Sequence, residues 1–466
     1  MSVSQLLEPE EGRFDCSIVE RLVDGARRYG LGLVPLWFGA FKNGMSTYAP
    51  AWVRFDHGRF PRAESEPGRS TLTLSPLAVS TRHADAKAYS SLLCELRRLD
   101  PEGRVVRMIQ VENEVGLHFF PRDRSPAAEA AFAAAVPAAL LTWLDARRGR
   151  LHPWLEQMLT PPAERGVGDW ITVFGDGADE IFMAWHFAGF VEAVAVAGRG
   201  EWDLPCFANA WLLQYPGEPA GEHPTGAPMT HVRDVWLAAA PSLGALAPDI
   251  YLDDFVGVCR DYSGWQPLLI PELRRDQIAA RMWYACGEHG ARLVAPFAYE
   301  QFWPAGSLAG AALGAEAQQL AQTCALLRSM LPVIGSRYGG HQVRGLFQID
   351  NLSRKFDLDG IRFQVEWHAP FSAPSTPGAV GLGTGGLGAG GLVAALGDGR
   401  FLIGGFGFSL RTHSQVPGRS IEIGALWDGT CEHGVFVPCQ RLNGDEHHLR
   451  LANAPGLRLV ELREIR

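Results

Sequence analysis

The strongest constraint on the fold is an alternation of short apolar runs with longer amphipathic stretches, which extends from Leu31 to about Met330. This alternation is typical of βα units, in which each strand of a parallel sheet is followed by a helix. Six runs are predicted to be strands: Leu31 to Phe38, Val105 to Val111, Cys206 to Leu213, Ala247 to Leu252, Pro267 to Pro271 and Arg292 to Phe297. The first part of the chain is therefore predicted to be an α/β structure with a parallel sheet.

The stretches between these runs carry helical signals. Ser17 and Glu20 have the spacing of a capping box, and Gly30 is placed to end the helix that they begin. Further helices are expected over Ala84 to Leu99, Pro126 to Arg148, Asp179 to Ala197, Asp276 to His289 and Leu308 to Met330.

After about Leu331 the sequence changes to short β-type runs broken by glycine, as in residues 401–411, 420–429 and 457–465. This pattern predicts an antiparallel β domain. A chain of 466 residues also exceeds the size at which a single hydrophobic core stops growing, about 250 to 300 residues. We therefore predict two domains, residues 1–331 and a β-sandwich-like domain over residues 332–466.

A glycine-rich run, Gly383 to Gly388, matches the pattern G-x-G-x-x-G. Dinucleotide binding requires a strand before this pattern and a helix after it, whereas this run lies among β segments. The sequence therefore favours a flexible loop here over a nucleotide site.

Composition argues against several kinds of partner. The net charge of −9 offers no basic surface for a phosphate backbone, so no nucleic acid partner is expected. The eight cysteines form no CxxC pair, and there is neither an HExxH motif nor a run of clustered histidines. No metal and no organic cofactor is therefore expected.

The sequence gives no signal for a membrane. The first residues lack a basic segment followed by an apolar stretch, and no window is apolar for the 18 or more residues that a span needs. As written, the chain is expected to be cytoplasmic.

Two glutamates follow apolar runs that are predicted to be strands. Glu114 follows MIQVEN, and Glu272 follows LLIP. The carboxyl ends of barrel strands hold the catalytic groups of α/β barrels, and glycoside hydrolysis needs two carboxyl groups that converge on one bond. A solvated loop carboxylate is the alternative for either residue alone. The matched contexts favour a catalytic pair.

Three segments together resemble the bacterial β-galactosidases of glycoside hydrolase family 35, in the branch that carries a C-terminal β domain. They are WFGAFKNGMSTYAPAWV (37–53), QVENEVG (110–116) and LLIPELRRD (268–276). RLNGD (441–445) and SIEIGALWDG (420–429) resemble that β domain, so the likeness runs from about Leu7 to the end. The resemblance implies a retaining (β/α)₈ barrel with the acid/base after strand 4 and the nucleophile after strand 7.

The same resemblance implies roles for individual residues. Glu114 would be the acid/base, Asn113 the group that binds the sugar 2-hydroxyl, and Glu272 the nucleophile. Tyr251 would donate a hydrogen bond to the nucleophile. The alternative role for Tyr251 is that of an aromatic side chain that only packs against its neighbours. The remaining candidates for sugar contacts, each with a scaffold role as the alternative, are Trp37, Lys42, Asn43, Asn209 and Trp211.

The chain departs from the family pattern at its start. Relatives have additional sequence ahead of LLEPEEGRFD, so we expect the TIM-type barrel to lack its first one or two strands. Two unpaired strand edges would favour association, and a homo-oligomer is one expected outcome. An export signal in that preceding sequence would make the protein periplasmic or secreted.

The expected reaction is cleavage of terminal β-D-galactosides through a galactosyl-enzyme ester, with a galactoside oligosaccharide or polysaccharide as the substrate. The alternative from another class is a non-catalytic carbohydrate-binding or regulatory protein on a degenerate glycosidase scaffold. A nucleotide-dependent oxidoreductase, which rests on the glycine run alone, ranks below both.

Overall fold

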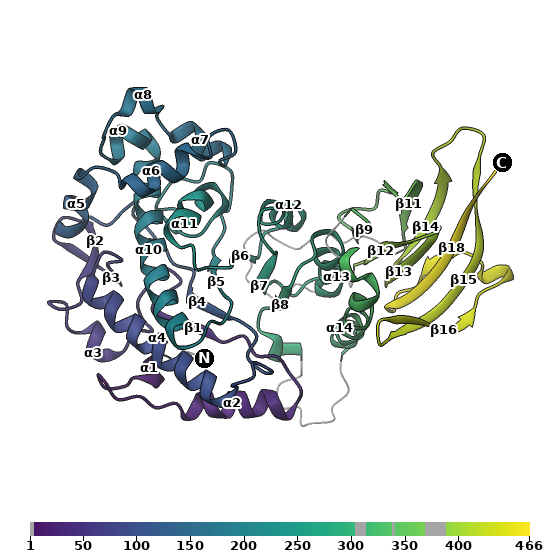
Figure 1. The fold of residues 1–466 in the computed structure, drawn as a ribbon, viewed down its shortest axis with the longest axis horizontal. Helices are drawn as coiled ribbons and strands as arrows, with labels where there is room; N and C mark the ends of the chain where they lie inside the picture. Colours follow the sequence, from purple (N-terminus) through teal and green to yellow (C-terminus); the bar gives the residue numbers. More distant parts are fainter. Residues whose placement is uncertain (1–3, 303–313, 338–340, 369–387) are drawn as a thin grey trace. The chain divides into compact units, whose positions relative to one another are not determined.

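The computed structural model describes residues 4–302, 314–337, 341–368 and 388–466 (Figure 1). Contacts between residues divide the chain into two compact units, residues 1–249 and 250–466. The predicted domain division after residue 331 stays a prediction. The motif residues Gly383 to Leu387 lie outside the described residues.

The first unit contains four neighbouring parallel strands in the order β1-β4-β5-β6. Each strand is buried along most of its length, as expected for a parallel sheet with both faces covered. The register pairs Trp37 with Val111, Ile109 with Cys206, and Asn209 with Ala247. The bounds are β1 (Leu36–Lys42), β4 (Ile109–Asn113), β5 (Cys206–Ala210) and β6 (Ala245–Ile250).

Two long helices of the first unit pack against each other, α4 (Val79–Leu99) and α10 (Ala178–Glu201) (Figure 1). Phe187 and Phe190 of α10 contact the ring of Phe41 in β1 edge to face, at centroid distances of 5.2 and 5.0 Å. The helical stretch Trp170–Glu201 is long and apolar enough to cross a membrane by length and composition. Most of it is buried inside the unit, so these contacts explain its apolar character as that of a core helix.

The structure corrects two predicted helices of the first unit. The stretch predicted as one helix from Pro126 to Arg148 is two, α5 (Pro126–Ala133) and α6 (Ala138–Asp145), because Pro137 disfavours a continuous helix and precedes the second one. The capping box is also wrong. Helix α2 (Ser17–Arg28) has no side-chain cap from Ser17, and the carboxylate of Asp15 accepts the N–H of Ser17 instead.

A hairpin that the sequence did not predict, β2 (Arg62–Glu66) and β3 (Arg69–Leu74), also belongs to the first unit. The remaining helices of this unit are α1 (Ser4–Leu7), α3 (Ala51–Arg54), α7 (Pro153–Met158), α8 (Pro162–Arg165), α9 (Trp170–Phe174) and α11 (Arg233–Ala239), with the short helices η1 (Gly175–Gly177) and η2 (Thr230–Val232).

The second unit begins with the parallel pair β7 (Leu269–Leu273) and β8 (Leu293–Pro296), which α13 (Ile278–His289) connects. All six predicted strands are therefore present, with shifted ends. The first begins at Leu36 rather than Leu31, and β7 runs on to include Glu272. Helices α12 (Phe255–Asp261) and α14 (Ala315–Ile334) and the short helices η3 (Tyr299–Phe302) and η4 (Gly335–Arg337) complete this part.

The predicted antiparallel β domain is confirmed as two sheets, ordered β10-β11-β14-β17 and β16-β15-β18-β13-β12-β9. A buried cluster that includes Phe363, Phe401 and Val460 draws side chains from both sheets, which makes a sandwich. The bounds are β9 (Val343–Phe347), β10 (Arg354–Leu358), β11 (Ile361–Trp367), β12 (Gly390–Gly397), β13 (Arg400–Phe406), β14 (Phe408–Ser414), β15 (Ser420–Glu432), β16 (Val435–Arg441), η5 (Gly444–Glu446), β17 (Leu449–Leu451) and β18 (Gly456–Ile465).

Within the second unit, α13 packs directly on this sandwich. A Cβ at Gly390 of β12 would lie 2.7 Å from the Cα of Ala280, so the helix and the strand touch backbone to backbone. Trp283 of α13 and Met330 of α14 join Leu392 in one buried cluster. The chain thus combines a parallel βα sheet of the TIM-barrel type with antiparallel sheets that follow it.

Candidate functional site

Glu114 directly follows β4 and is held by its backbone. Its φ of +43° is left-handed, a conformation that non-glycine residues seldom adopt. Its N–H donates to Oδ1 of Asn209 at 3.0 Å, and its carbonyl accepts from the N–H of Gly44 at 3.0 Å. Glu114 is 6% exposed. Its backbone is held in place jointly by Asn209 in β5 and by Gly44, which follows β1.

Asn113, the last residue of β4, is completely buried. Its Oδ1 accepts a hydrogen bond from Nζ of Lys42 at 2.9 Å, and its backbone carbonyl accepts from the N–H of Asn43 at 3.2 Å. Its Nδ2 has no hydrogen-bond partner among the described residues. Because a buried donor is costly when unpaired, this amide is suited to an acceptor on a ligand.

The end of β5 supplies two further predicted residues. Asn209 uses both ends of its amide, since Nδ2 donates to Oδ2 of Asp249 at 2.6 Å while Oδ1 accepts from Glu114. Trp211 is 37% exposed and meets His118 edge to face, with 5.3 Å between ring centroids. An exposed indole beside a strand end can stack on the C–H face of a sugar.

Beneath these residues lies a pair of carboxyl groups that the sequence analysis missed, Glu112 in β4 and Asp85 in α4. The carboxyl of Glu112 accepts the N–H groups of Ala40 and Phe41 at 3.3 and 2.8 Å. Asp85 accepts from the same Ala40 and, at 2.8 Å, from the indole of Trp37. The two carboxyl groups therefore hold the backbone of β1 at Ala40 and Phe41, directly before Lys42.

Burial and then the neighbouring Asp85 raise the pKa of Glu112 well above its usual range. Burial also raises the pKa of Asp85, and the hydrogen bond from Glu112 offsets only part of this increase. Because two adjacent carboxylates in a dry site cannot both be ionised, we expect the pair to share one proton, held on Glu112. Trp37 is fully buried against Tyr89 and bonded to Asp85, an arrangement that favours its scaffold role.

In the second unit, Glu272 is the penultimate residue of β7 rather than a residue beyond the strand. The hydroxyl of Tyr251 donates to Oε2 of Glu272 at 2.7 Å, the hydrogen bond that the family resemblance implies. Arg274 holds Tyr251 in turn, because its Nη1 donates to the Tyr251 carbonyl at 3.0 Å and also bonds Asp253.

The structure thus brings the predicted residues together in two sets. In the first unit, hydrogen bonds join Lys42 to Asn43 and Asn113, and another joins Glu114, the residue after Asn113, to Asn209. In the second unit, a hydrogen bond joins Tyr251 to Glu272. Their catalytic roles, and the meeting of Glu114 with Glu272, stay predictions. Asp85 and Glu112 carried no sequence signal beyond the position of Glu112 in β4.

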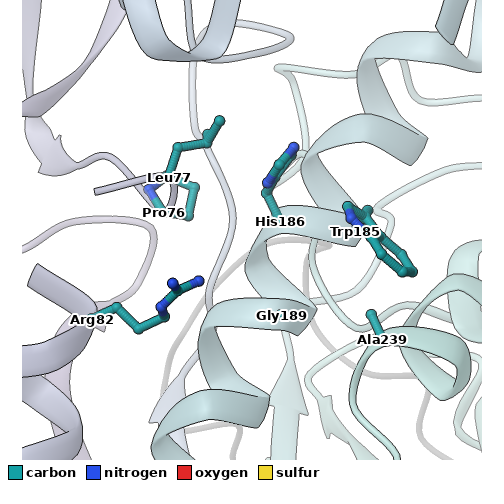
Figure 2. Close-up of a pocket in the computed structure, with 7 residues that line it drawn as sticks. All are labelled: Pro76, Leu77, Arg82, Trp185, His186, Gly189 and Ala239. Carbon is teal, nitrogen blue, oxygen red and sulfur yellow. The ribbon is translucent and has the colours of Figure 1, made fainter. Parts of the chain in front are cut away.

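A cavity of about 330 Å³ opens elsewhere in the first unit, between the start of α4 and the middle of α10 (Figure 2). Arg82 lines it from α4, and His186 and Trp185 line it from α10, with Trp185 on the side of Ala239. Burial and then the charge of Arg82 lower the pKa of His186 to about 4. None of the predicted site residues lines this cavity.

Similar solved structures are mainly glycoside hydrolases. The β-galactosidase from psychrophilic Marinomonas ef1 is 14% identical, with a TM-score of 0.43 over 64% of this chain and 49% of that one. The β-galactosidase from Bacillus circulans sp. alkalophilus is 16% identical, with a TM-score of 0.38 over 64% and 45%. Endo-glycoceramidase II from Rhodococcus sp. is 10% identical, with a TM-score of 0.36 over 99% and 87%.

This chain spans about half the length of the two β-galactosidases. No curated protein matches it. Residues 320–453, which extend from α14 to just beyond β17, match a family model described as a domain of unknown function (DUF5597).

Proposed function

We propose that this protein is a retaining glycoside hydrolase of the family 35 type, which cleaves terminal β-D-galactosides. The observation that carries the proposal is the position of Glu114 and Glu272 at the carboxyl ends of two parallel strands, each with a polar partner suited to its role. The unpaired amide of Asn113 lies next to Glu114, and the Tyr251 hydroxyl bonds Glu272. The sequence motifs around both glutamates support the same assignment.

In the proposed mechanism Glu114 protonates the oxygen of the leaving group while a carboxylate oxygen of Glu272 attacks the anomeric carbon. This step breaks the glycosidic bond and forms a galactosyl ester. Glu114, now ionised, then takes a proton from water, whose oxygen displaces Glu272 and releases galactose with retained configuration. Such a mechanism requires the two carboxyl groups to be about 5 to 5.5 Å apart.

The two roles predict different behaviour of the two variants. Glu272→Ala should lose at least about 10⁴-fold in turnover of every aryl β-galactoside, because no ester can form. Glu114→Ala should lose much less with a dinitrophenyl leaving group than with a phenyl one, because a good leaving group needs no proton. Steady-state kinetics on both substrates check these outcomes.

Covalent trapping tests the nucleophile directly. A 2-deoxy-2-fluorogalactosyl fluoride should add one sugar per chain, and peptide mass spectrometry should locate it on Glu272. The exposed Glu432→Ala and Glu102→Ala are the controls and should react like the wild type. Normal turnover by Glu272→Ala would refute the assignment, and galactoside binding without hydrolysis by the wild type would indicate a carbohydrate-binding protein instead.

A further inference from the structure

Three metal-ligating side chains converge in the interior of the first unit, apart from the residues used above. Glu180 lies in the first turn of α10, His231 lies in η2, and His223 lies on the segment before η2. Nε2 of His223 is 3.0 Å from Oε2 of Glu180, and Nε2 of His231 is 3.2 Å from Oε1. One potential ligand atom from each residue lies within 4.8 Å of the other two.

These distances match those between ligands of one metal ion. Two ligands that are each ~2.0–2.1 Å from a tetrahedral ion lie about 3.3 Å from one another. The two imidazole rings are nearly perpendicular, at 82°, so each presents a ring nitrogen to Glu180 from a different side. Two imidazoles and a carboxylate form a donor set that suits Zn²⁺ and similar divalent ions.

The burial and charge of the cluster also suit a cation. All three residues are less than a tenth exposed, so water does not screen them. A buried anion faced by two ring nitrogens needs a positive charge, which either a proton or a metal ion can supply.

The backbone around the cluster is rigidly placed. Gly226 donates its N–H to Oε1 of Glu180 at 3.1 Å, and its carbonyl accepts from the indole of Trp236 at 3.1 Å. A Cβ at Gly226 would lie 2.6 Å from the backbone carbon of Met183, so this segment packs directly on α10. The histidines therefore cannot move away from Glu180 without unpacking the segment.

We propose that Glu180, His223 and His231 bind one divalent transition-metal ion, with Zn²⁺ as the probe, and that a water completes its coordination. The ion ties α10 to residues 223–231. That segment pairs with the chain after Glu114, because Thr225 and Leu117 exchange backbone hydrogen bonds at 2.9 and 3.1 Å. Because all three ligands are buried, the role we assign to the ion is to hold these segments together, and the proposal is independent of the proposed hydrolase activity.

Metal content of the full-length, untagged chain tests the proposal. After dialysis against buffered Zn²⁺, mass spectrometry of the elements should find one zinc per wild-type chain, and Glu180→Gln and His231→Gln should each lose it. The double variant His447→Gln/His448→Gln removes an exposed histidine pair of the second unit and should keep the zinc. Loss of zinc in that control alone would place the ion on the surface and overturn the proposal.

A second measurement uses only the wild type, so it tests the proposal even if the variants fail to fold. Co²⁺ added to the metal-free wild type should produce the visible absorption bands of a tetrahedral centre, and one equivalent of Zn²⁺ should abolish them. The Tm of the wild type should rise with the concentration of free Zn²⁺, because an ion that binds only the folded state stabilises it. A wild-type chain that takes up no stoichiometric zinc and shows no Co²⁺ bands would overturn the proposal and leave a cluster that only a proton neutralises.

Discussion

At the residue scale, the oxygen and the nitrogen of the Asn113 side-chain amide differ in their hydrogen bonding. Oδ1 is bonded to Lys42, whereas Nδ2 is buried without a protein partner among the described residues. If Nδ2 donates to the sugar 2-hydroxyl, Asn113→Ala should lower kcat/KM for an aryl β-galactoside by roughly 100-fold, because this bond strengthens in the transition state. The same substitution should change the rate for the 2-deoxygalactoside only slightly.

The comparison of the two substrates is decisive for Asn113, because a general loss of structure would lower both rates equally. The exposed Asn453→Ala is the matched control and should leave both rates unchanged. Equal losses on both substrates would show that Asn113 is scaffold.

The proton shared by Glu112 and Asp85 gives a second test at this scale. Because folding raises the pKa of Glu112, the stability that its neutral form contributes is complete below about pH 4.5 and is lost as the pH rises toward the folded-state pKa. Glutamine imitates a protonated glutamate but cannot ionise. The free energy of urea unfolding should therefore fall with rising pH more steeply for the wild type than for Glu112→Gln, and parallel curves would contradict the shared proton.

At the element scale, α10 depends on the close approach of Gly226. The φ of Gly226 is +80°, and a Cβ there would meet the backbone of Met183 and Ala184 at 2.6 and 2.7 Å. Gly226→Ala should destabilise the fold by about 2 to 4 kcal/mol, the sum of left-handed strain and overpacking. Chemical denaturation measures this loss.

Gly217 provides the matched control. It has the same φ of +80°, but a Cβ there would meet nothing within 4 Å. Gly217→Ala should therefore cost only the strain, about 1 to 2 kcal/mol. Equal losses for the two variants would mean that the contact with α10 contributes nothing.

At the scale of the whole molecule, buried titratable groups set the response to acid. His186 has a pKa of about 4, below its ordinary value of 6.5, so the folded state favours the neutral ring. The stability that this ring contributes is complete above about pH 6.5 and is lost as the pH falls toward 4, on the order of 3 kcal/mol. His186→Leu should remove this loss, as unfolding measured between pH 7 and 4.5 will show.

Glu180 acts in a lower pH window. Its pKa of about 2 means that the stability from its ionised form is lost only as the pH falls from 4.5 toward 2. The difference between the wild type and His186→Leu should therefore develop before Glu180 begins to titrate. A difference between the wild type and His186→Leu that stays constant from pH 7 to 4.5 would refute the burial argument for His186.

The amino-acid sequence by itself determined the parts of this protein that depend on local pattern. Six apolar runs became parallel strands and the glycine-broken β runs became the sandwich, because side-chain periodicity and chain breakers act between neighbours in sequence. The motifs likewise placed Asn113, Glu114 and Glu272 at strand ends. Even the break before Pro137 had a local signal.

Only the tertiary structure decided which distant groups meet. Glu180 lies 43 residues from His223 and 51 from His231, so no spacing pattern could reveal their cluster. The contact between Asp85 and Glu112 likewise joins residues that are distant in sequence. Their shared proton depends on the burial of both carboxyl groups. The direction of Glu114 was also undetermined, since Asn209, 95 residues away, accepts its N–H. Burial and long-range hydrogen bonds are properties of the packed chain, and they change a residue's chemistry without changing its neighbours in sequence.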